Sequence, residues 1–271
     1  MATCDNPPAN VPLPHSTVPV EASDRLRILG VDVLNPNLDS ALRLVSPALQ
    51  GDPSDPQALY FVNAHTLNNA AADPSYRRAL NRARFVLGDG TGVRWAARLQ
   101  GVRMRANLNG TDFIPTLLEA TSGRGYRCYL LGATPETIGR TLEAAKARFP
   151  GWSFVGCQHG FLDASQTADT IAEINSLAPN LLLVAMGNPL QERWIDAHLA
   201  ELRVPLSVGV GGLFNFWSHV RRAPRWVRKL GCEWLFVMTQ QPAKWRRYVY
   251  GNPLFMARLA AERLKLRSWD R

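Results

Sequence analysis

Residues 181–202 read LLLVAMGNPLQERWIDAHLAEL. An unbroken apolar run, Leu181–Met186, is followed by the turn residues Gly187-Asn188-Pro189 and then by a segment whose apolar side chains have helical spacing, Leu190–Leu202. A strand without polar alternation is typical of a parallel sheet that is covered on both faces. This stretch therefore predicts one strand–loop–helix unit of an α/β protein.

The same unit recurs on both sides of this stretch. From residue 25 to residue 215, short apolar runs alternate with amphipathic segments. We expect a Rossmann-like, mostly parallel sheet with helices on both faces. The expected strands are Arg27–Val33, Ala58–Asn63, Arg84–Leu87, Arg127–Leu131, Ser153–Cys157, Leu181–Met186 and Leu206–Val210. The expected helices are Asp39–Gln50, His65–Ala72, Ser75–Arg82, Gly92–Gln100, Asp112–Ser122, Pro135–Phe149, Ala164–Leu177 and Leu190–Leu202.

Both ends of the chain differ from this central region. Residues 1–24 contain five prolines and no long apolar run, which predicts a disordered leader rather than a signal peptide. Beyond residue 215 the alternation stops, and we expect helices over Trp226–Gln241 and Pro253–Arg267. The sequence thus divides into a leader (1–24), a Rossmann-like core (25–215) and a helical appendage (216–271).

The net charge of +9 is concentrated in the C-terminal appendage. Residues 221–271 hold thirteen of the 31 Lys and Arg but three of the 22 Asp and Glu, and residues 216–271 hold five of the eight Trp. This combination suits an anionic partner such as lipid headgroups, nucleic acid or a diphosphate. A solvated basic face would explain the arginines but not the tryptophans. No stretch approaches the ~20 apolar residues that span a bilayer, so we expect any membrane contact from the surface.

Several classes of protein are disfavoured by motifs that the sequence lacks. The four cysteines form no CxxC pair, and no D-x-D, H-x-H or carboxylate cluster is present. We therefore expect no metal site and no cofactor, and we expect reduced thiols in a cytosolic protein. The nearest approach to a GxGxxG fingerprint is Gly88-Asp89-Gly90-Thr91-Gly92, which lacks the third glycine at the required offset. This disfavours a dehydrogenase.

Polar residues and glycines follow five of the expected strands. In an open parallel sheet, ligands bind beyond the carboxyl ends of the strands, and glycines there let backbone N–H groups approach phosphate oxygens. These residues therefore predict one polar site at a single edge of the sheet. They are Asn63, Gly88-Asp89-Gly90, Gly132-Ala133-Thr134, Gly187 to Gln191, and Gly209 to Gly212.

Asp89 is the most suggestive single residue of this set. A carboxylate between two glycines is sterically open, which suits a general base that takes a proton from a hydroxyl nucleophile. The same position also suits the cap of the following helix, and the spacing alone leaves both open. Gln191 is either a ligand contact or a solvated residue of a first helical turn. His65 and His159 lack the partners of a metal site or a triad, and we interpret them as structural.

Six segments, in order, resemble the WecG/TagA/CpsF glycosyltransferases (glycosyltransferase family 26) over about residues 27–260. The resemblance implies an inverting, metal-independent hexosyltransferase of bacterial surface or exopolysaccharide biosynthesis. It would move a sugar from a UDP-sugar to a polyprenyl-diphosphate-linked saccharide at the inner face of the plasma membrane. The segments are FVNAHTLNNAAADPSYRRALNRARFVLGDGTGVRWAARLQG from Phe61, LLGATPETIGR, LLLVAMGNPLQERWI, SVGVGGLFNF, RRAPRWVRKLGCEWLF and QPAKWRRYVYGNPLFM.

The resemblance also implies roles for individual residues. Asp89 matches the general base of the family, and Asn63 and Gln191 match positions that line the sugar-nucleotide site. The arginines of the RRAPRW segment match an appendage that covers the diphosphate and touches the membrane. The other expected substrate-binding residues are Gly90, Asn109, Gly132, Asn188, Gly211, Gly212, Arg222, Arg225 and Arg228.

The sequence departs from the family pattern at three positions. Asn107 stands where many members have an arginine, which Arg103 or Arg105 would have to replace, and Asn215 and Val237 replace a common Asp and Arg. The NLNGTDF segment around Asn107 is similar to the exopolysaccharide branch, which includes xanthan- and acetan-type glucosyltransferases.

Three other readings stay open at this point. A nucleic-acid-binding α/β protein would use the basic appendage, although the core is slightly acidic and no RNA-binding aromatic motif is present, so we expect no nucleic acid. A Rossmann oxidoreductase lacks its fingerprint. A non-catalytic scaffold of a polysaccharide assembly complex would have no need of an intact Asp89.

Overall fold

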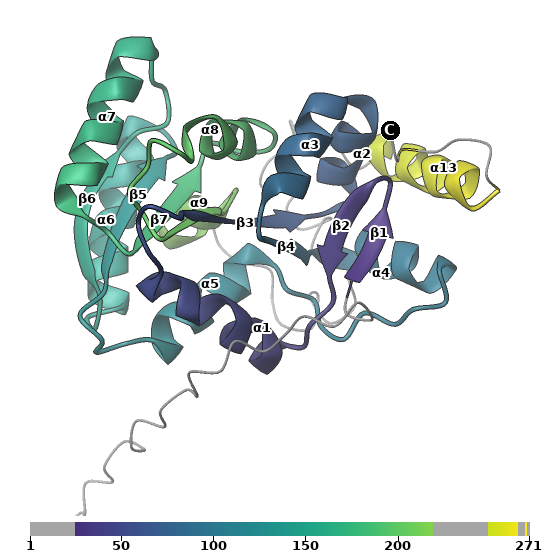
Figure 1. The fold of residues 1–271 in the computed structure, drawn as a ribbon, viewed down its shortest axis with the longest axis horizontal. Coiled ribbons are helices and arrows are strands. Elements are labelled where there is room, and N and C mark those ends of the chain that lie inside the picture. Colours follow the sequence, from purple (N-terminus) through teal and green to yellow (C-terminus); the bar gives the residue numbers. More distant parts are fainter. Residues whose placement is uncertain (1–24, 219–248, 265–268, 270–271) are drawn as a thin grey trace, which may run out of the picture.

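A computed structural model of the chain describes residues 25–218, 249–264 and 269. Eight strands form one sheet in the order β1-β2-β4-β3-β8-β7-β5-β6, and every neighbouring pair is parallel except β1 and β2. The predicted fold class is therefore confirmed (Figure 1). The strands are β1 (Arg25–Ile28), β2 (Val31–Leu34), β3 (Gln57–Val62), β4 (Phe85–Gly88), β5 (Arg127–Gly132), β6 (Ser153–Gln158), β7 (Leu181–Ala185) and β8 (Leu206–Gly209).

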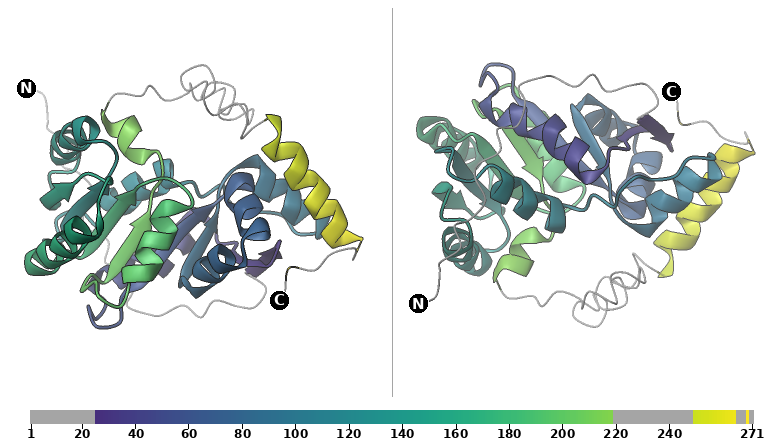
Figure 2. Two further views of the ribbon diagram at one scale, coloured as in Figure 1. Left: turned by 90° about the horizontal axis from the view of Figure 1, so that it is seen from above. Right: turned by 90° about the horizontal axis from the view of Figure 1, so that it is seen from below.

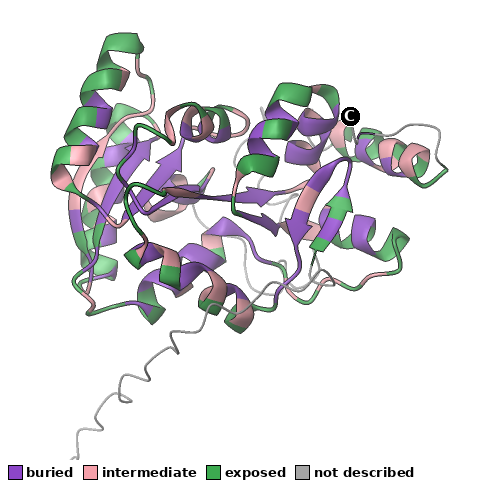
Figure 3. Cartoon of the chain, in the orientation of Figure 1, coloured by how far each residue is buried: buried purple, intermediate pink, exposed green. Residues whose placement is uncertain are grey.

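Helices cover both faces of this sheet, because its strands are apolar on both sides. Along β7, Leu182 and Val184 belong to one buried cluster, while Leu181, Leu183 and Ala185 belong to the other (Figure 3). Helices α2 (Ala64–Ala72), α3 (Pro74–Arg82), α4 (Gly90–Leu99), α7 (Ala164–Leu177), α8 (Leu190–His198) and α13 (Gly251–Arg263) contribute to the first cluster. Helices α1 (Leu38–Val45), α5 (Gly110–Ala120), α6 (Pro135–Arg148) and α9 (Leu213–Ser218) contribute to the second.

The single strand expected over Arg27–Val33 is wrong, because this stretch is a hairpin of β1 and β2. Its two-residue turn is Leu29-Gly30, and both residues have positive φ, of 48° and 77°. Such a turn matches the twist of antiparallel strands, and it normally carries Asn or Gly at its first position. Leucine at that position hid the turn in the sequence. The side-chain amide of Asn81 donates to the Gly30 carbonyl at 2.8 Å and supports the turn.

The other expected elements shift by a few residues at their ends. The helix expected over Asp39–Gln50 divides into α1 and a 3₁₀ turn, η2 (Ser46–Gln50), where Pro47 interrupts the α-helical hydrogen bonds. The expected leader and the expected helix Trp226–Gln241 lie outside the described residues. The helix expected over Pro253–Arg267 is found as α13.

The described part of the appendage packs on the core. Helix α13 lies against α2 and α4 (Figure 2), and it buries Phe255 and Leu259 in the cluster that those helices form. Trp269 is also buried there, and its indole N–H donates to the Ala71 carbonyl at 3.0 Å. Trp269 also lies directly against Gly30: a Cβ on Gly30 would come within 2.4 Å of the Trp269 carbonyl oxygen. The chain therefore returns to the core at its C-terminal end, while the boundary at residue 215 stays a prediction.

We predict that Trp269→Ala destabilises the fold by about 3–5 kcal/mol, because it empties a buried indole site and removes a hydrogen bond. Trp269→Phe keeps most of the buried apolar surface, so it should cost a smaller part of that amount. Urea unfolding followed by far-UV circular dichroism measures both. An unchanged midpoint in Trp269→Ala would show that this residue is not docked on the core in solution.

Candidate active site at the carboxyl edge of the sheet

The parallel register brings five strand ends to one edge. Val62 lies opposite Gly88, Tyr60 opposite Gly209, and Gly132 opposite Ala185. Backbone hydrogen bonds of 2.8 Å continue the ladder past the strands, from Asp89 N to Val62 O, Val210 N to Val184 O, and Ala133 N to Ala185 O. The register therefore places the loops that follow these five strands at one edge of the sheet, as expected from the sequence.

Asp89 follows β4 at the N-cap position of α4. Its side chain makes no capping hydrogen bond to that helix, so the structural alternative considered from the sequence is not realised. Asp89 is half-buried, and Gly90 has a φ of +88°, a conformation that an L side chain rarely adopts. The turn thus presents a carboxylate at the helix start without using it as a cap.

Asn107 holds this turn from the opposite side. Its side-chain oxygen accepts a hydrogen bond from the Gly90 N–H at 2.6 Å. Arg103 and Arg105, the candidate replacements for the family arginine, are exposed in the same segment. Asn35 fixes their backbone, since its amide donates to the Arg103 carbonyl at 3.2 Å and its oxygen accepts from the Arg105 N–H at 2.9 Å.

Helix α13 supports the beginnings of two helices of this edge. Gly92, in the first turn of α4, faces Ala64, in the first turn of α2, and the ring of Phe255 from α13. A Cβ at Gly92 would lie 2.9 Å from the Cβ of Ala64 and 3.4 Å from the Phe255 ring. Phe255 therefore packs against the helix starts that follow Asn63 and Asp89.

Asn63 and Asn109 have structural roles that the sequence did not indicate. Each is an N-cap: the Asn63 oxygen accepts from the N–H groups of His65 and Thr66, and the Asn109 oxygen accepts from that of Asp112 at 2.8 Å. Capping fixes the orientation of both side chains at the edge. Their expected contact with substrate stays a prediction.

Gln191 joins two loops of the edge. It is 2% exposed, which excludes the solvated alternative. Its side-chain oxygen accepts from the N–H of Gly211 at 2.9 Å and from that of Gly187 at 3.2 Å, so the loops after β8 and β7 share one acceptor. Both glycines have positive φ. Gln191 thereby fixes the two glycine loops relative to each other.

The remaining expected residues divide between the edge and the undescribed segment. Gly132 ends β5 with a φ of +127°, and a Cβ there would lie 2.6 Å from the Ala185 carbonyl, so only glycine fits. Gly212 is exposed at the start of α9. Arg222, Arg225 and Arg228 lie outside the described residues, and the segment that carries them runs between α9 and α13.

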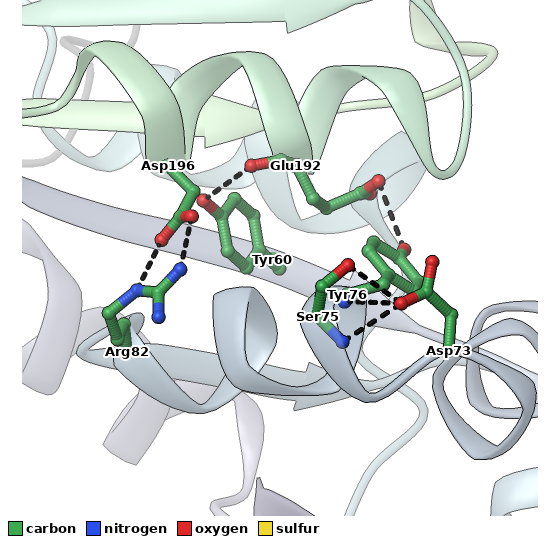
Figure 4. Close-up of polar contacts among 7 residues, drawn as sticks. All are labelled: Tyr60, Asp73, Ser75, Tyr76, Arg82, Glu192 and Asp196. Carbon is green, nitrogen blue, oxygen red and sulfur yellow. Dashed lines mark hydrogen bonds and ion pairs between the residues drawn. The ribbon is translucent and has the colours of Figure 1, made fainter.

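Glu192 was missed by the sequence analysis, although it is the most buried ionisable group of the site. Its side chain is 0% exposed, and it accepts hydrogen bonds from Asn188 and from Gln191 at 2.7 Å. It also accepts one from the Tyr76 hydroxyl at 3.1 Å (Figure 4). Burial raises the pKa of Glu192 to about 7. The helical spacing held the signal, since Glu192 shares a face of α8 with the buried Ile195.

Two ion pairs flank Glu192 and hold α8 on α3. The Arg82 guanidinium donates two hydrogen bonds to the Asp196 carboxylate, and the one from Nε is 2.7 Å long (Figure 4). Arg193 forms an ion pair with Asp73. The Tyr60 hydroxyl of β3 donates to the Glu192 backbone carbonyl at 3.2 Å. Helix α8, which carries Gln191 and follows the loop with Asn188, is thus attached to α3 and β3 by polar contacts.

The edge has the parts of a site for a phosphate-containing substrate. Glycine loops, the Asp89 carboxylate at a helix start and the Gln191 amide follow the strand ends of this edge, and such glycine loops suit phosphate oxygens. Among the residues that the structure describes, no three His, Cys, Asp or Glu side chains gather as a metal site.

Comparison with known proteins identifies the family to which this chain belongs. The family model "Glycosyl transferase WecG/TagA/CpsF family" matches residues 26–269. A relative in Bacillus spizizenii is 33% identical over 180 residues, which cover 66% of this chain and 69% of that protein. A relative in Staphylococcus aureus is 26% identical over 246 residues, covering 90% and 95%. Both are named N-acetylglucosaminyldiphosphoundecaprenol N-acetyl-beta-D-mannosaminyltransferase.

The chain therefore belongs to the WecG/TagA/CpsF family of glycosyl transferases, as the sequence motifs indicated. It is a hexosyltransferase.

We predict that Glu192 makes the fold less stable as the pH rises. Because burial raises its pKa from 4.5 to about 7, the folded protein binds a proton that the unfolded chain has released. The stability that this proton contributes is fully present below the unfolded-state pKa of 4.5. It is lost as the pH rises through the folded-state pKa of about 7, which lowers the free energy of unfolding by ~3 kcal/mol. Urea unfolding between about pH 5 and about pH 8 measures it, and Glu192→Gln should remove that part of the pH dependence.

Two tyrosines provide a matched pair of controls. Tyr76→Phe removes a donor that favours the ionised carboxylate, so the pH-dependent loss should move to higher pH. Tyr60→Phe removes a bond to a backbone carbonyl of the same residue and should leave the pH dependence in place. Equal pH slopes for the wild type and Glu192→Gln would contradict a raised pKa at this site.

Proposed function

We propose that the chain is an inverting, metal-independent glycosyltransferase that transfers a sugar from a UDP-sugar to a polyprenyl-diphosphate-linked saccharide. Asp89 acts as the general base and takes the proton of the acceptor hydroxyl. The hydroxyl oxygen forms a bond to the anomeric carbon as the bond to UDP breaks on the opposite side. The single observation that carries this proposal is the position of the half-buried Asp89 carboxylate, between two glycines that follow β4 at the carboxyl edge, in a chain of this family.

The departing UDP needs stabilisation that the edge supplies in part. Gly187, Gly211 and Gly212 lie in the loops that Gln191 joins. The N–H groups of Gly187 and Gly211 donate to Gln191, so we assign the stabilisation of phosphate oxygens to other backbone N–H groups of these loops. Their glycines leave room for close approach. Arg222, Arg225 and Arg228 supply the positive charge, since the segment that holds them starts at α9 and ends at α13, both of which pack on the core.

The acceptor follows from the names of the relatives. The names of the relatives in Bacillus spizizenii and Bacillus subtilis state N-acetylglucosaminyldiphosphoundecaprenol as the acceptor. The Bacillus subtilis protein is 30% identical over 188 residues. We propose the same class of acceptor here. The donor sugar is N-acetylmannosamine if the chain follows these relatives, and glucose if it follows the exopolysaccharide branch that the segment around Asn107 resembles.

The lipid-linked acceptor requires contact with a bilayer. No helix in the described ranges is long and apolar enough to cross one. We propose that the chain is cytoplasmic and associates peripherally with the inner face of the plasma membrane. The basic, Trp-rich appendage supports this assignment, because cationic and aromatic side chains favour anionic lipid headgroups.

We predict that Asp89→Asn lowers the transfer rate by about 10²–10⁴-fold, the range of general base catalysis, with little effect on stability. The assay measures UDP release from a panel of UDP-sugars with a short-chain polyprenyl-diphospho-N-acetylglucosamine acceptor. Asp169→Asn is the matched control, because Asp169 is an exposed aspartate on α7. It should transfer at the wild-type rate.

The same assay separates the remaining alternatives. Acceptor-dependent UDP release that survives in Asp89→Asn would overturn the assignment of the base but keep the reaction. No release with any donor and acceptor would favour a non-catalytic scaffold. RNA binding that falls steeply with salt and is indifferent to UDP-sugars would favour the nucleic-acid alternative.

A further inference from the structure

Helix α4 of the core has an unusual exposed side. Trp95 is 51% exposed and Leu99 is 43% exposed, and the two lie one turn apart. Arg94 and Arg98 are also exposed beside them, so that two cations alternate with two large apolar side chains. We call these four residues the α4 face. They lie within a few turns of Asp89, which precedes the same helix.

Along the sequence, the charged residues that follow the α4 face have the same sign as its arginines. Arg103 and Arg105 follow in the next segment, and both are exposed. No acidic residue occurs in the sequence between Asp89 and Asp112. This basic stretch lies outside the C-terminal window that holds the overall positive excess, which is why the composition of the core did not reveal it.

Helix α13 packs beside α4 and carries exposed apolar side chains of its own. Gly92, Trp95 and Leu99 share one side of α4, and Gly92 meets Phe255 of α13, so the α4 face borders α13. On α13, Phe255 and Leu259 point into the core, while Leu254 is 46% exposed. Tyr250 and Leu264, which flank the helix at its two ends, are 65% and 67% exposed. Figure 2 shows α13 alongside the helices of the core. The α13 stripe consists of these last three residues.

We propose that the α4 face and the α13 stripe together form a surface that docks on an anionic lipid bilayer. An exposed Trp and Tyr among leucines and arginines is the composition of a membrane interface, with the rings at the headgroup level and the cations on lipid phosphates. Docking is thus a property of the core as well as of the basic appendage.

Charge favours a lipid over the other occupants of this surface. Residues 219–248 carry eight Lys or Arg and one Glu, so this segment of the chain would bring like charge onto the arginines. A second copy of the same surface would do the same. An anionic headgroup layer is complementary to both the arginines and the apolar side chains.

The consequence of this docking for catalysis rests on the proposed function, in which Asp89 is the general base. Phe255 of α13 packs on the first turn of α4, next to the loop that holds Asp89. A bilayer bound to the outer side of these two helices therefore lies beside the carboxyl edge of the sheet. The diphosphate of a lipid-linked acceptor is held at that same headgroup level, within reach of the base.

The test uses the full-length protein and vesicles of phosphatidylethanolamine with about one-third phosphatidylglycerol, at low salt. We expect Arg94→Gln with Arg98→Gln to weaken co-sedimentation at least about tenfold, since each cation contributes roughly fivefold. Trp95→Ala with Leu99→Ala should also weaken it several-fold. Arg43→Gln with Arg140→Gln is the matched control, on helices of the opposite sheet face, and Leu38→Ala is the apolar control.

An activity comparison separates this inference from the proposed function. The α4 variants should keep their rate on a water-soluble short-chain acceptor and lose it on a long-chain acceptor embedded in vesicles. Wild-type vesicle binding by both α4 variants would overturn the inference while leaving the reaction untouched. Wild-type vesicle binding with a changed oligomeric mass would assign the surface to a second copy and also overturn it. Absence of transfer to either acceptor would refute the proposed function, and the vesicle result would still decide the docking.

Discussion

The parallel register of β3, β4, β7 and β8 is the constraint on which the candidate site depends. It fixes which residues meet at the carboxyl edge, because the pairings of Val62 with Gly88 and of Tyr60 and Val184 with Gly209 bring the four strand ends close together. Gln191 then fastens the loop after β7 to the loop after β8 through two backbone N–H groups. Both faces of these strands are apolar and covered by helices, so a one-residue slip would move every side chain from one buried cluster into the other and disrupt the packing of both.

A second layer of contacts holds the edge from behind. Glu192 is fully buried and accepts three hydrogen bonds. Its contacts join α8 to α3 and so hold the loop between β7 and α8 in place. On the other side of the edge, Phe255 of α13 packs where α2 and α4 begin. Helix α13 therefore supports the same edge that the central strands define.

Local periodicity predicted most of this fold, because apolar strands and amphipathic helices leave a direct pattern in the sequence. It failed at the first hairpin, where Leu29 adopts a positive φ that leucine rarely adopts, so no turn signal was visible. The strand ends predicted which residues share the edge, but not what their side chains do there. Asn63 and Asn109 cap helices, Gln191 bridges loops, and Glu192 is buried by contacts with α3, all of which depend on tertiary neighbours.

The central claim is that the carboxyl edge of the sheet binds the nucleotide of the donor next to Asp89. A crystal structure of the full-length protein with UDP tests it most directly. The account predicts the diphosphate against the glycine loops that Gln191 joins, with the Asp89 carboxylate facing the side from which an acceptor hydroxyl would approach. UDP bound at another face of the sheet, or at this edge with Asp89 turned away from it, would contradict the account.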